Sequence, residues 1–367
     1  MTSNALLVQR QKRILKAANK DMMIKKELFG VTDEGEDIFS FTFGNKQGTE
    51  IVILNYGGIV QSIRVPDAAG ETRDVCLGFD TITQYEEDTT YMGAMIGRCA
   101  NRIGGGSFSI NGTTYKVALN NGPNHLHGGN KGFNKFVYDC SIDGDKLILT
   151  RRSIDMEEGY PGNLDLSFGY SLSELNELVL EYNAVSDADT IVNLTNHCYF
   201  NLAGEGKGDI HNHSLTIRAS FFSENDENCL PTGRLLPVED TPFDFREPKT
   251  IGEDIGKSDI QLLNCNGYDH NYILDAYDNW KPSVELFSKE SGITLSMTTT
   301  KPCMQLYTGN FLSGAKGKSA NYTKRAGLCL EAQYRPNMQD SSFAFKPPYL
   351  KSGEQYRHKT VYRFGVG

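Results

Sequence analysis

The 367-residue sequence contains no apolar run that approaches the ~20 residues needed to cross a bilayer. Its N-terminus also lacks the apolar stretch and cleavage site of a secretory signal. These two absences argue against a membrane-spanning helix and against export. We therefore expect a cytoplasmic protein with no membrane partner.

Basic residues are fewer than acidic ones, with 37 Lys and Arg against 46 Asp and Glu, which gives a formal net charge of −9. Nucleic acids and anionic membranes bind basic surfaces that gain from counterion release. The charge balance therefore argues against both as partners and favours a neutral or polar small ligand.

Closely spaced cysteine pairs are also missing, because the eight cysteines form no Cys-x-x-Cys motif. Scattered cysteines in a long chain of this kind indicate reduced and mostly buried thiols. The stretch "GRCANRIGGGSF" lacks the Gly-Lys-Ser/Thr of a phosphate loop and leads into a hairpin rather than a helix. We interpret it as a tight turn that places Asn101 and Arg102.

Residues 1–27 carry basic side chains among helix formers but show little apolar periodicity. We expect a basic extension outside the core, either helical or frayed. A mitochondrial presequence is the alternative, because such leaders are also basic and poor in acidic residues.

Helical periodicity of useful length is missing after this extension, and no Pro/Ser-rich linker divides the chain. Residues 28–367 instead show period-two alternation, as in "LDLSFGYSL" at 164–172 and "ELVLEYNA" at 177–184. Such alternation is typical of antiparallel strands with one solvated face. The Asn111-Gly112 pair predicts a two-residue hairpin, because both turn positions require a positive φ. We therefore predict an all-β protein in which residues 28–367 form one large antiparallel β-sandwich or barrel.

Two titratable residues stand in apolar, strand-like stretches: Glu331 in "GLCLEAQYRP" and His197 in "NLTNHCYFNLAG". A carboxylate loses its hydration there, so Glu331 either joins a structural hydrogen-bond network or has a raised pKa. Cys198 beside His197 suggests a nucleophilic Cys/His pair, but adjacent side chains on a strand point to opposite faces. Alone, His197 is either a hydrogen-bonded core residue or a catalytic one.

Other polar residues allow more than one interpretation. Two histidine pairs have a spacing that a metal site could use: His125 with His127, and His211 with His213. Glycine and proline indicate loops, however, and no third ligand stands at a recognisable spacing. Asp269 in "GYDHNYIL" fits a turn, and Gln305 in "MQLYTGNF" fits pairing with the backbone.

Nine stretches nevertheless occur in an order that closely resembles the galactose mutarotase (aldose 1-epimerase) family: "NYGGIVQSIRVPD", "IGRCANRIGGGSFSINGTTY", "NHLHGG", "EGYPGNL", "NLTNHCYFNLAG", "PTGRLLPVEDTPFDFR", "GYDHNYIL", "QLYTGNF" and "LCLEAQYRPN". The resemblance runs from about Phe29 to the C-terminus. It implies an all-β supersandwich with an open cleft for a hexose. The implied reaction interconverts the α and β anomers of an aldose without a cofactor or a metal.

The resemblance also implies roles for individual residues. Glu331 would be the general base at the C1 hydroxyl, and His197 would be the acid that protonates the ring oxygen. The matching sugar-binding positions are Asn101, Arg102, His127, Asp269 and Gln305. His125 has no match and is expected to be structural. Ring opening and closure exchange the two catalytic roles, so we expect the pKa values of Glu331 and His197 to move toward neutrality.

Three alternative functions stay open. A glycoside hydrolase would need two flanking carboxylates, for which Glu331 and Asp269 could be nominated. A chain with this fold could also bind sugar without turnover, and a hexose-phosphate epimerase would need additional cationic groups at the cleft. The sequence favours a monosaccharide partner such as galactose or glucose and is compatible with a monomer or a dimer.

Overall fold

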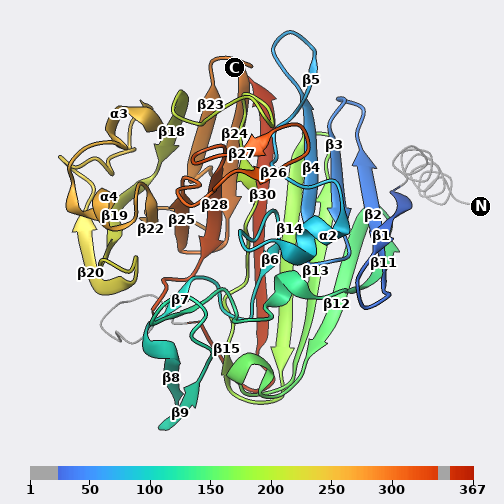
Figure 1. The fold of residues 1–367 in the computed structure, drawn as a ribbon, viewed down its shortest axis with the longest axis vertical. Helices are drawn as coiled ribbons and strands as arrows, with labels where there is room; N and C mark the ends of the chain where they lie inside the picture. The colour runs from blue at the N-terminus through green and yellow to red at the C-terminus, as the bar shows by residue number, and fades with distance from the viewer. Residues whose placement is uncertain (1–23, 338–347) are drawn as a thin grey trace, which may run out of the picture.

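The computed structural model describes residues 24–337 and 348–367 (Figure 1). The expected N-terminal extension lies mostly outside these residues. Strand β1 begins at Lys25, three residues before the boundary expected from the sequence, so the last part of the extension belongs to the first strand. Within the described residues, no helix is both long enough and apolar enough to cross a membrane.

The described chain is built mainly of antiparallel strands, which confirms the all-β prediction. The N-terminal sheet contains, in spatial order, β1 (Lys25–Val31), β2 (Asp37–Gly44), β3 (Glu50–Leu54), β4 (Val60–Pro66) and β5 (Thr72–Asp74). The largest sheet contains β11 (Asp139–Asp143), β12 (Lys146–Ser153), β13 (Leu164–Leu172), β14 (Glu177–Ser186), β30 (Gln355–Val366), β24 (Ile293–Thr299), β23 (Val284–Ser288), β18 (His213–Ile217) and β21 (Lys249–Thr250). The third sheet contains β17 (Tyr199–Phe200), β28 (Leu328–Gln333), β25 (Cys303–Tyr307), β22 (Asp269–Leu274), β19 (Ala219–Asn225) and β20 (Pro231–Pro237).

Short elements connect these sheets. The two-stranded ladders pair β6 (Met95–Ile96) with β16 (Thr195–Asn196), β7 (Arg102–Ile103) with β10 (His125–Leu126), β8 (Ser107–Ile110) with β9 (Thr113–Lys116), β15 (Thr190–Ile191) with β29 (Tyr349–Leu350), and β26 (Ala315–Lys316) with β27 (Asn321–Tyr322). The helical turns are α2 (Ile82–Glu87), α3 (Ile251–Asp254), α4 (Ile260–Asn264), η1 (Gly104–Gly106), η2 (Phe133–Lys135) and η3 (Glu157–Gly159).

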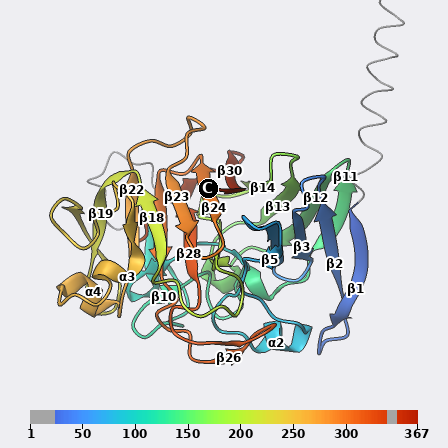
Figure 2. The same ribbon diagram turned by 90° about the horizontal axis from the view of Figure 1, so that it is seen from above.

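The N-terminal sheet and the third sheet both pack against the largest sheet, as Figures 1 and 2 show from two sides. Tyr170 of β13 donates a hydrogen bond of 2.6 Å to the Gly58 carbonyl, beside the N-terminal sheet. Tyr362 of β30 donates one of 2.8 Å to the Leu330 carbonyl in β28. One continuous apolar core fills the space between the sheets, which is the layered arrangement expected of a β-sandwich. The single-domain organisation of residues 28–367 stays a prediction.

The alternation that predicts the strands also sets their orientation. In β14, Leu178, Leu180 and Tyr182 are buried while the residues between them reach solvent in part. The predicted hairpin joins β8 to β9, with φ of 50° at Asn111 and 81° at Gly112. Both values are positive, as this turn requires.

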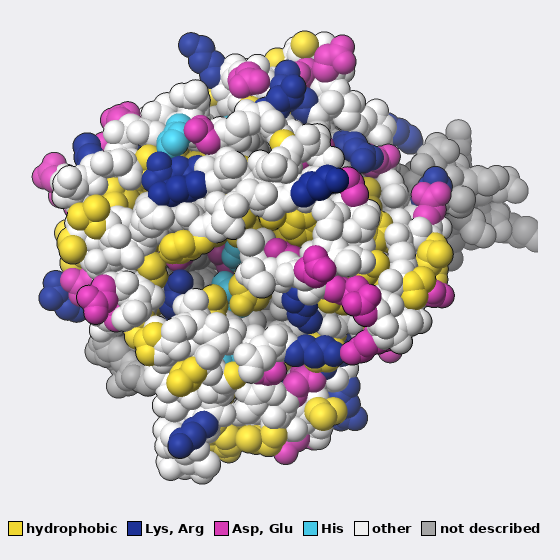
Figure 3. All heavy atoms as spheres, in the orientation of Figure 1, with side chains coloured by type: hydrophobic (Ala, Val, Ile, Leu, Met, Phe, Trp, Pro, Cys, Tyr) yellow, Lys and Arg dark blue, Asp and Glu magenta, His cyan; other side chains and the backbone are white. Residues whose placement is uncertain are grey.

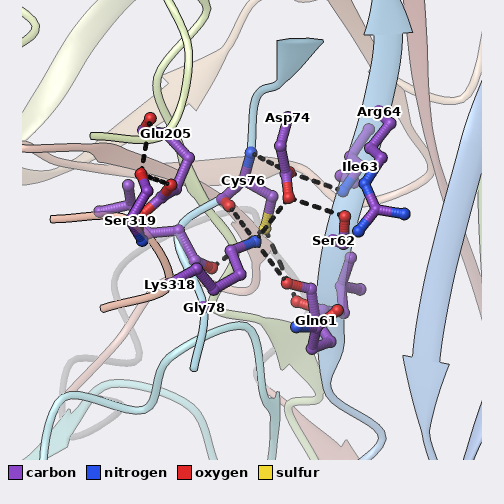
Figure 4. Close-up of polar contacts among 12 residues, drawn as sticks. Gln61, Ser62, Ile63, Arg64, Asp74, Cys76, Gly78, Glu205, Lys318 and Ser319 are labelled. Atoms are coloured by element: carbon purple, nitrogen blue, oxygen red, sulfur yellow. Dashed lines mark hydrogen bonds and ion pairs between the residues drawn. The ribbon is translucent and has the colours of Figure 1, made fainter. Parts of the chain in front are cut away.

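A lysine ties the loop after β26 to the N-terminal sheet (Figure 4). The Lys318 Nζ donates hydrogen bonds to Asp74 Oδ2 at 2.7 Å, to the Cys76 carbonyl at 2.8 Å and to the Gln61 carbonyl at 2.9 Å. Asp74 also accepts from Ser62 Oγ at 2.7 Å. The Lys318 and Asp74 side chains are 11% and 19% exposed, so water compensates little for a lost partner.

Replacement of this lysine, Lys318→Met, is expected to lower the free energy of unfolding by roughly 2–3 kcal/mol, because it leaves the Asp74 carboxylate partly buried and without its cation. Urea denaturation measures the change. Lys316→Met is the matched control, since Lys316 is exposed two residues earlier and should leave the unfolding free energy within about 0.5 kcal/mol of wild type. Equal stability of the two variants would contradict the role assigned to Lys318.

Candidate active site

Three strands of the third sheet place polar side chains on one face. Gln305 pairs directly with Glu331 across β25 and β28, and with Asn271 across β25 and β22. Asp269 is two residues before Asn271 and therefore points to the same side of the sheet. Register thus brings Asp269, Gln305 and Glu331 together from positions up to 62 residues apart.

A cavity of about 480 Å³ lies over this face. Figure 3 shows it as a hollow in which histidine side chains are visible. Its lining residues are Thr89, Thr90, Tyr91, Asn101, Arg102, Asn121, Leu126, His127, His197, Tyr199, Glu227, Asn228, Cys229, Asn264, Asp269, Tyr307, Phe311 and Glu331. The volume falls in the range typical of small-molecule sites.

His197 and Glu331 face each other in this cavity. His197 Nε2 and Glu331 Oε1 are 3.6 Å apart, and the two residues are only 4% and 2% exposed. Backbone hydrogen bonds hold the histidine, whose N–H donates to the Ala94 carbonyl at 2.8 Å. Glu331 Oε2 has no hydrogen-bond partner. A buried carboxyl oxygen without a partner is available to a ligand.

Burial controls the protonation of this pair. It raises the pKa of Glu331 well above the usual range, with a further contribution from the charge of Asp269 and opposition from Arg102. Burial also lowers the pKa of His197 to about 4. The expectation that both pKa values move toward neutrality is therefore wrong for His197, since desolvation penalises its charged form. Burial thus favours the neutral form of both side chains.

His127 approaches His197 from a glycine-rich loop. The His127 Nδ1 accepts a hydrogen bond of 3.1 Å from the Asn101 N–H, and its ring stands perpendicular to that of His197 at a centroid distance of 5.4 Å. The next residue, Gly128, has a φ of 91°, and a Cβ there would lie 1.8 Å from the Gly97 carbonyl oxygen. Only glycine allows this approach, so "HGG" fixes the position of the His127 ring.

Arg102, Asp269 and Gln305 form a buried network. Arg102 Nη1 lies 3.5 Å from Asp269 Oδ2, and Gln305 Nε2 donates to Asp269 Oδ1 at 2.6 Å. Asp269 is 6% exposed, so it is not a surface turn residue, and Gln305 pairs with a side chain as well as with its strand neighbours. Arg102 also donates to Asn121 Oδ1 at 3.1 Å.

Histidines outside the cavity have structural contacts. His125 lies with its ring nitrogens 2.8 Å from the Ala118 carbonyl and 2.6 Å from the Tyr160 hydroxyl, in keeping with the structural role expected for it. The His213 Nε2 accepts from the Leu202 N–H at 2.9 Å, and His211 contacts Asp209. Neither proposed histidine pair forms a metal site within the described residues.

The sequence does not reveal which cysteine lies near His197. Cys198 points away and contacts Cys76, with 3.0 Å between the sulfur atoms. Cys329 instead lies 3.5 Å from His197 Nδ1. Burial raises the pKa of the Cys329 thiol well above its usual range, so it is not an activated nucleophile. Cys329 stands two residues before Glu331, so strand alternation places both side chains on the same face of β28. This alternation could have predicted that Cys329 lies near the site.

Aromatic residues that sequence reasoning missed complete the cavity. Tyr91 has a φ of 59° and places its ring 4.7 Å from His127 and 5.8 Å from His197. The Tyr307 ring lies 5.9 Å from His197 and stacks with Phe311. Tyr307 follows Gln305 by two residues, so strand alternation could have found it.

Two groups of side chains in the described residues could hold a metal ion. One is His127, His197 and Glu331, and the other is Cys229, Cys265 and Asp269, with the ligand atoms of each group within 4.8 Å of one another. The first group is also suited to proton transfer, because a carboxyl and an imidazole face each other in a polar cavity. The fold and site together define an all-β protein built for acid/base chemistry on a small polar ligand.

Comparison with known proteins agrees with this class. The family model for aldose 1-epimerase matches residues 40–363. The galactose mutarotase of Bos taurus is 42% identical over 316 residues, which cover 86% of this chain and 90% of the relative. The aldose 1-epimerase of Escherichia coli (strain K12) is 34% identical over 335 residues, covering 90% and 96% of the two chains.

A solved structure shows the same relationship in three dimensions. The galactose 1-epimerase from Lactobacillus acidophilus NCFM superposes with a TM-score of 0.83 at 30% identity, covering 95% of this chain and all of the other. The chain belongs to the aldose 1-epimerase family. The family name describes an epimerase, and epimerases are isomerases.

Proposed function

We propose that the protein is a mutarotase that interconverts the α and β anomers of a hexose such as galactose or glucose. The observation that carries the proposal is the 3.6 Å approach of His197 Nε2 to Glu331 Oε1 in a polar cavity of sugar-binding size. Ring opening requires removal of the proton on O1 and delivery of a proton to O5. A base and an acid that face one substrate suit this task.

The reactive state has Glu331 as carboxylate and His197 as imidazolium. Sugar hydroxyl groups that donate to the carboxylate stabilise its charge, and the pair's single proton then resides on His197. His197 Nε2 faces Glu331, whereas Nδ1 lies 3.5 Å from Cys329 Sγ, so Nε2 is the nitrogen that we assign to uptake and release of the proton.

Ring opening cancels the charges of the pair. Glu331 takes the O1 proton, His197 gives its proton to O5, and the C1–O5 bond breaks to leave a neutral open-chain aldehyde. Burial favours the neutral forms of both side chains, so the low-dielectric site favours this step. Rotation about C1–C2 and the reverse transfers then close the other anomer.

The remaining cavity residues supply sugar contacts in this proposal. Asp269 is held by Arg102 and Gln305 and accepts from adjacent sugar hydroxyls, while Asn101 and His127 contact the sugar from the opposite loop. Among the described lining residues, Arg102 is the only lysine or arginine, and Asp269 neutralises it. This arrangement favours a neutral sugar over a sugar phosphate. The cytoplasmic location stays a prediction.

Polarimetry on freshly dissolved α-D-galactose and α-D-glucose tests the proposal directly. We expect the protein to accelerate the approach to anomeric equilibrium for at least one of the two sugars. Sugar binding by the folded protein without any acceleration would reject the enzyme and leave a non-catalytic sugar-binding protein.

The pH profile is a second test. Activity needs one proton on the His197–Glu331 pair, so kcat/KM should fall below about pH 4, where His197 of the free enzyme gains a second proton. It should also fall at higher pH, where Glu331, whose pKa is raised by burial, loses its proton. Initial rates by polarimetry, corrected for the spontaneous reaction, give the profile. A rate that begins to fall well above pH 4 as the pH is lowered would contradict the assignment of the acidic limb to His197.

Asp269→Asn should change both the KM for the sugar and the pH dependence of the rate. The substitution removes a charged acceptor for sugar hydroxyls, so KM should rise about tenfold or more. It also removes a negative charge that raises the pKa of Glu331, so the alkaline limb of the pH profile should move to lower pH. Steady-state kinetics across pH measure both effects. An unchanged KM would remove Asp269 from the sugar site.

A further inference from the structure

A second cluster of reactive side chains lies beside the proposed sugar site. Cys229, Cys265 and Asp269 have their ligand atoms within 4.8 Å of one another and are 5%, 0% and 6% exposed. They come from three different segments: the turn between β19 and β20, the residue after α4, and the first residue of β22. Cys229 and Asp269 line the cavity, so the cluster is reached from it.

The backbone holds both cysteines in place without a ligand. Cys229 has a φ of 55°, which is uncommon for a residue with a side chain, and its N–H donates to the Asp226 carbonyl at 3.0 Å. The Cys265 carbonyl accepts a hydrogen bond of 2.9 Å from Asn310 Nδ2. The thiols therefore converge because of the surrounding structure.

A buried asparagine lies next to the cluster. Asn225 is 3% exposed, and its Nδ2 lies 3.4 Å from Cys265 Sγ and 2.9 Å from the Asp269 carbonyl. Its Oδ1 is buried without a hydrogen-bond partner. The Asn225 amide thus directs its Nδ2 donor toward the cluster and holds the Asp269 backbone next to the Cys265 thiol.

We propose that Cys229, Cys265 and Asp269 form a binding site for a thiophilic divalent cation of the Zn²⁺ class. Two thiolates and a carboxylate are a ligand set typical of zinc, with cavity water in the fourth position. Each thiol releases its proton to the solvent as its sulfur binds the cation. The three negative ligands and the divalent cation leave one negative charge, which the neighbouring Arg102 guanidinium balances.

This site would couple cation binding to sugar binding. The coupling rests on the proposed mutarotase function, because Asp269 is assigned both to the cation and to the sugar hydroxyls. A cation on Asp269 withdraws that carboxylate from the sugar. Zn²⁺ and hexose are therefore expected to exclude each other, and Zn²⁺ would inhibit anomer exchange in competition with the sugar.

Cd²⁺ is the probe for the site, because Cd²⁺–thiolate bonds absorb in the ultraviolet. Titration of the full chain should show one equivalent of Cd²⁺ with this absorption. Cys265→Ser and Cys229→Ser should each lose it, and circular dichroism checks that both variants fold. Two variants offer separate tests, so a folding failure in one leaves the other informative.

Matched controls address the other thiols near the cavity. Cys329→Ser removes the sulfur next to His197, and Cys198→Ser removes one sulfur of the close Cys76–Cys198 pair. Both controls should keep the one-equivalent Cd²⁺ absorption. No thiolate absorption in wild type, or absorption that survives in Cys265→Ser and Cys229→Ser but disappears in a control, would overturn the site.

The coupling to sugar needs its own measurement. Saturating galactose should weaken Cd²⁺ binding at least tenfold, and Zn²⁺ should slow mutarotation by wild type but not by Cys265→Ser, each compared with its own rate without the cation. Galactose that binds without changing Cd²⁺ affinity would overturn the shared use of Asp269. The Cd²⁺ absorption requires no turnover, so its result stands even if the protein proves inactive.

Discussion

Glu331→Gln is expected to lower kcat for anomer exchange by about 10²- to 10⁴-fold. The amide has nearly the size of the carboxyl group but cannot accept the O1 proton. The fold should persist, because burial already favours the neutral form of Glu331 in the wild type. Polarimetric rates at saturating sugar measure the change.

His197→Asn should produce a loss of similar size, since it removes the group that delivers the proton to O5. The double variant should be little worse than either single one, because the two residues act as a unit. Glu227→Gln is the matched control: it makes the same chemical change at an exposed position on the wall of the cavity and should keep kcat within about twofold. A folded Glu331→Gln protein with the wild-type rate would exclude Glu331 as the base.

Local sequence pattern is sufficient to predict the strands with the clearest alternation and one turn. Alternation in "ELVLEYNA" corresponds to the buried side of β14, and Asn111-Gly112 forms the expected hairpin, because each depends only on neighbouring residues. The sequence does not predict that β1 begins at Lys25, because the first residues of this strand are exposed and show no apolar alternation.

The site depends on distances that the sequence does not contain. Resemblance supplies the residue types, but only the register of β25 against β28 brings Gln305 opposite Glu331. The low pKa of His197 could not be predicted either, because its cause is complete burial by residues distant in the sequence. The proximity of the Cys229 and Cys265 thiols could not be predicted either, since 35 residues lie between these two cysteines and no motif contains both.

Acid should destabilise the fold through its buried histidines. Burial lowers the pKa of His197 and His213 to about 4 and that of His270 to about 3, from an ordinary value of 6.5. The unfolded chain binds protons at these residues below pH 6.5, whereas the folded chain does not until pH 4 or lower. Each lowered pKa therefore contributes stability that is present above pH 6.5 and is lost as the pH falls from 6.5 to the folded-state pKa. The loss is about 3 kcal/mol for His197 and for His213 and about 5 kcal/mol for His270.

The local contacts explain why these histidines stay neutral. His213 Nε2 accepts a hydrogen bond of 2.9 Å from the Leu202 N–H, and His270 Nδ1 accepts one of 3.1 Å from the Asp269 N–H. A second proton on either ring would have to occupy that accepting nitrogen and would break the hydrogen bond. Two phenylalanine rings also surround His270. Glu331 acts in the opposite direction over part of the range, because the folded chain protonates it above its ordinary pKa of 4.5.

We expect the free energy of unfolding, measured by urea denaturation, to fall by several kcal/mol between pH 6.5 and 4.5. His213→Gln isolates one contribution outside the cavity and should reduce the slope by about 1.4 kcal/mol per pH unit in that range. Equal slopes for wild type and His213→Gln would show that His213 takes up its proton in the folded chain. The desolvation that we assign to His213, and by the same reasoning to His197, would then be wrong.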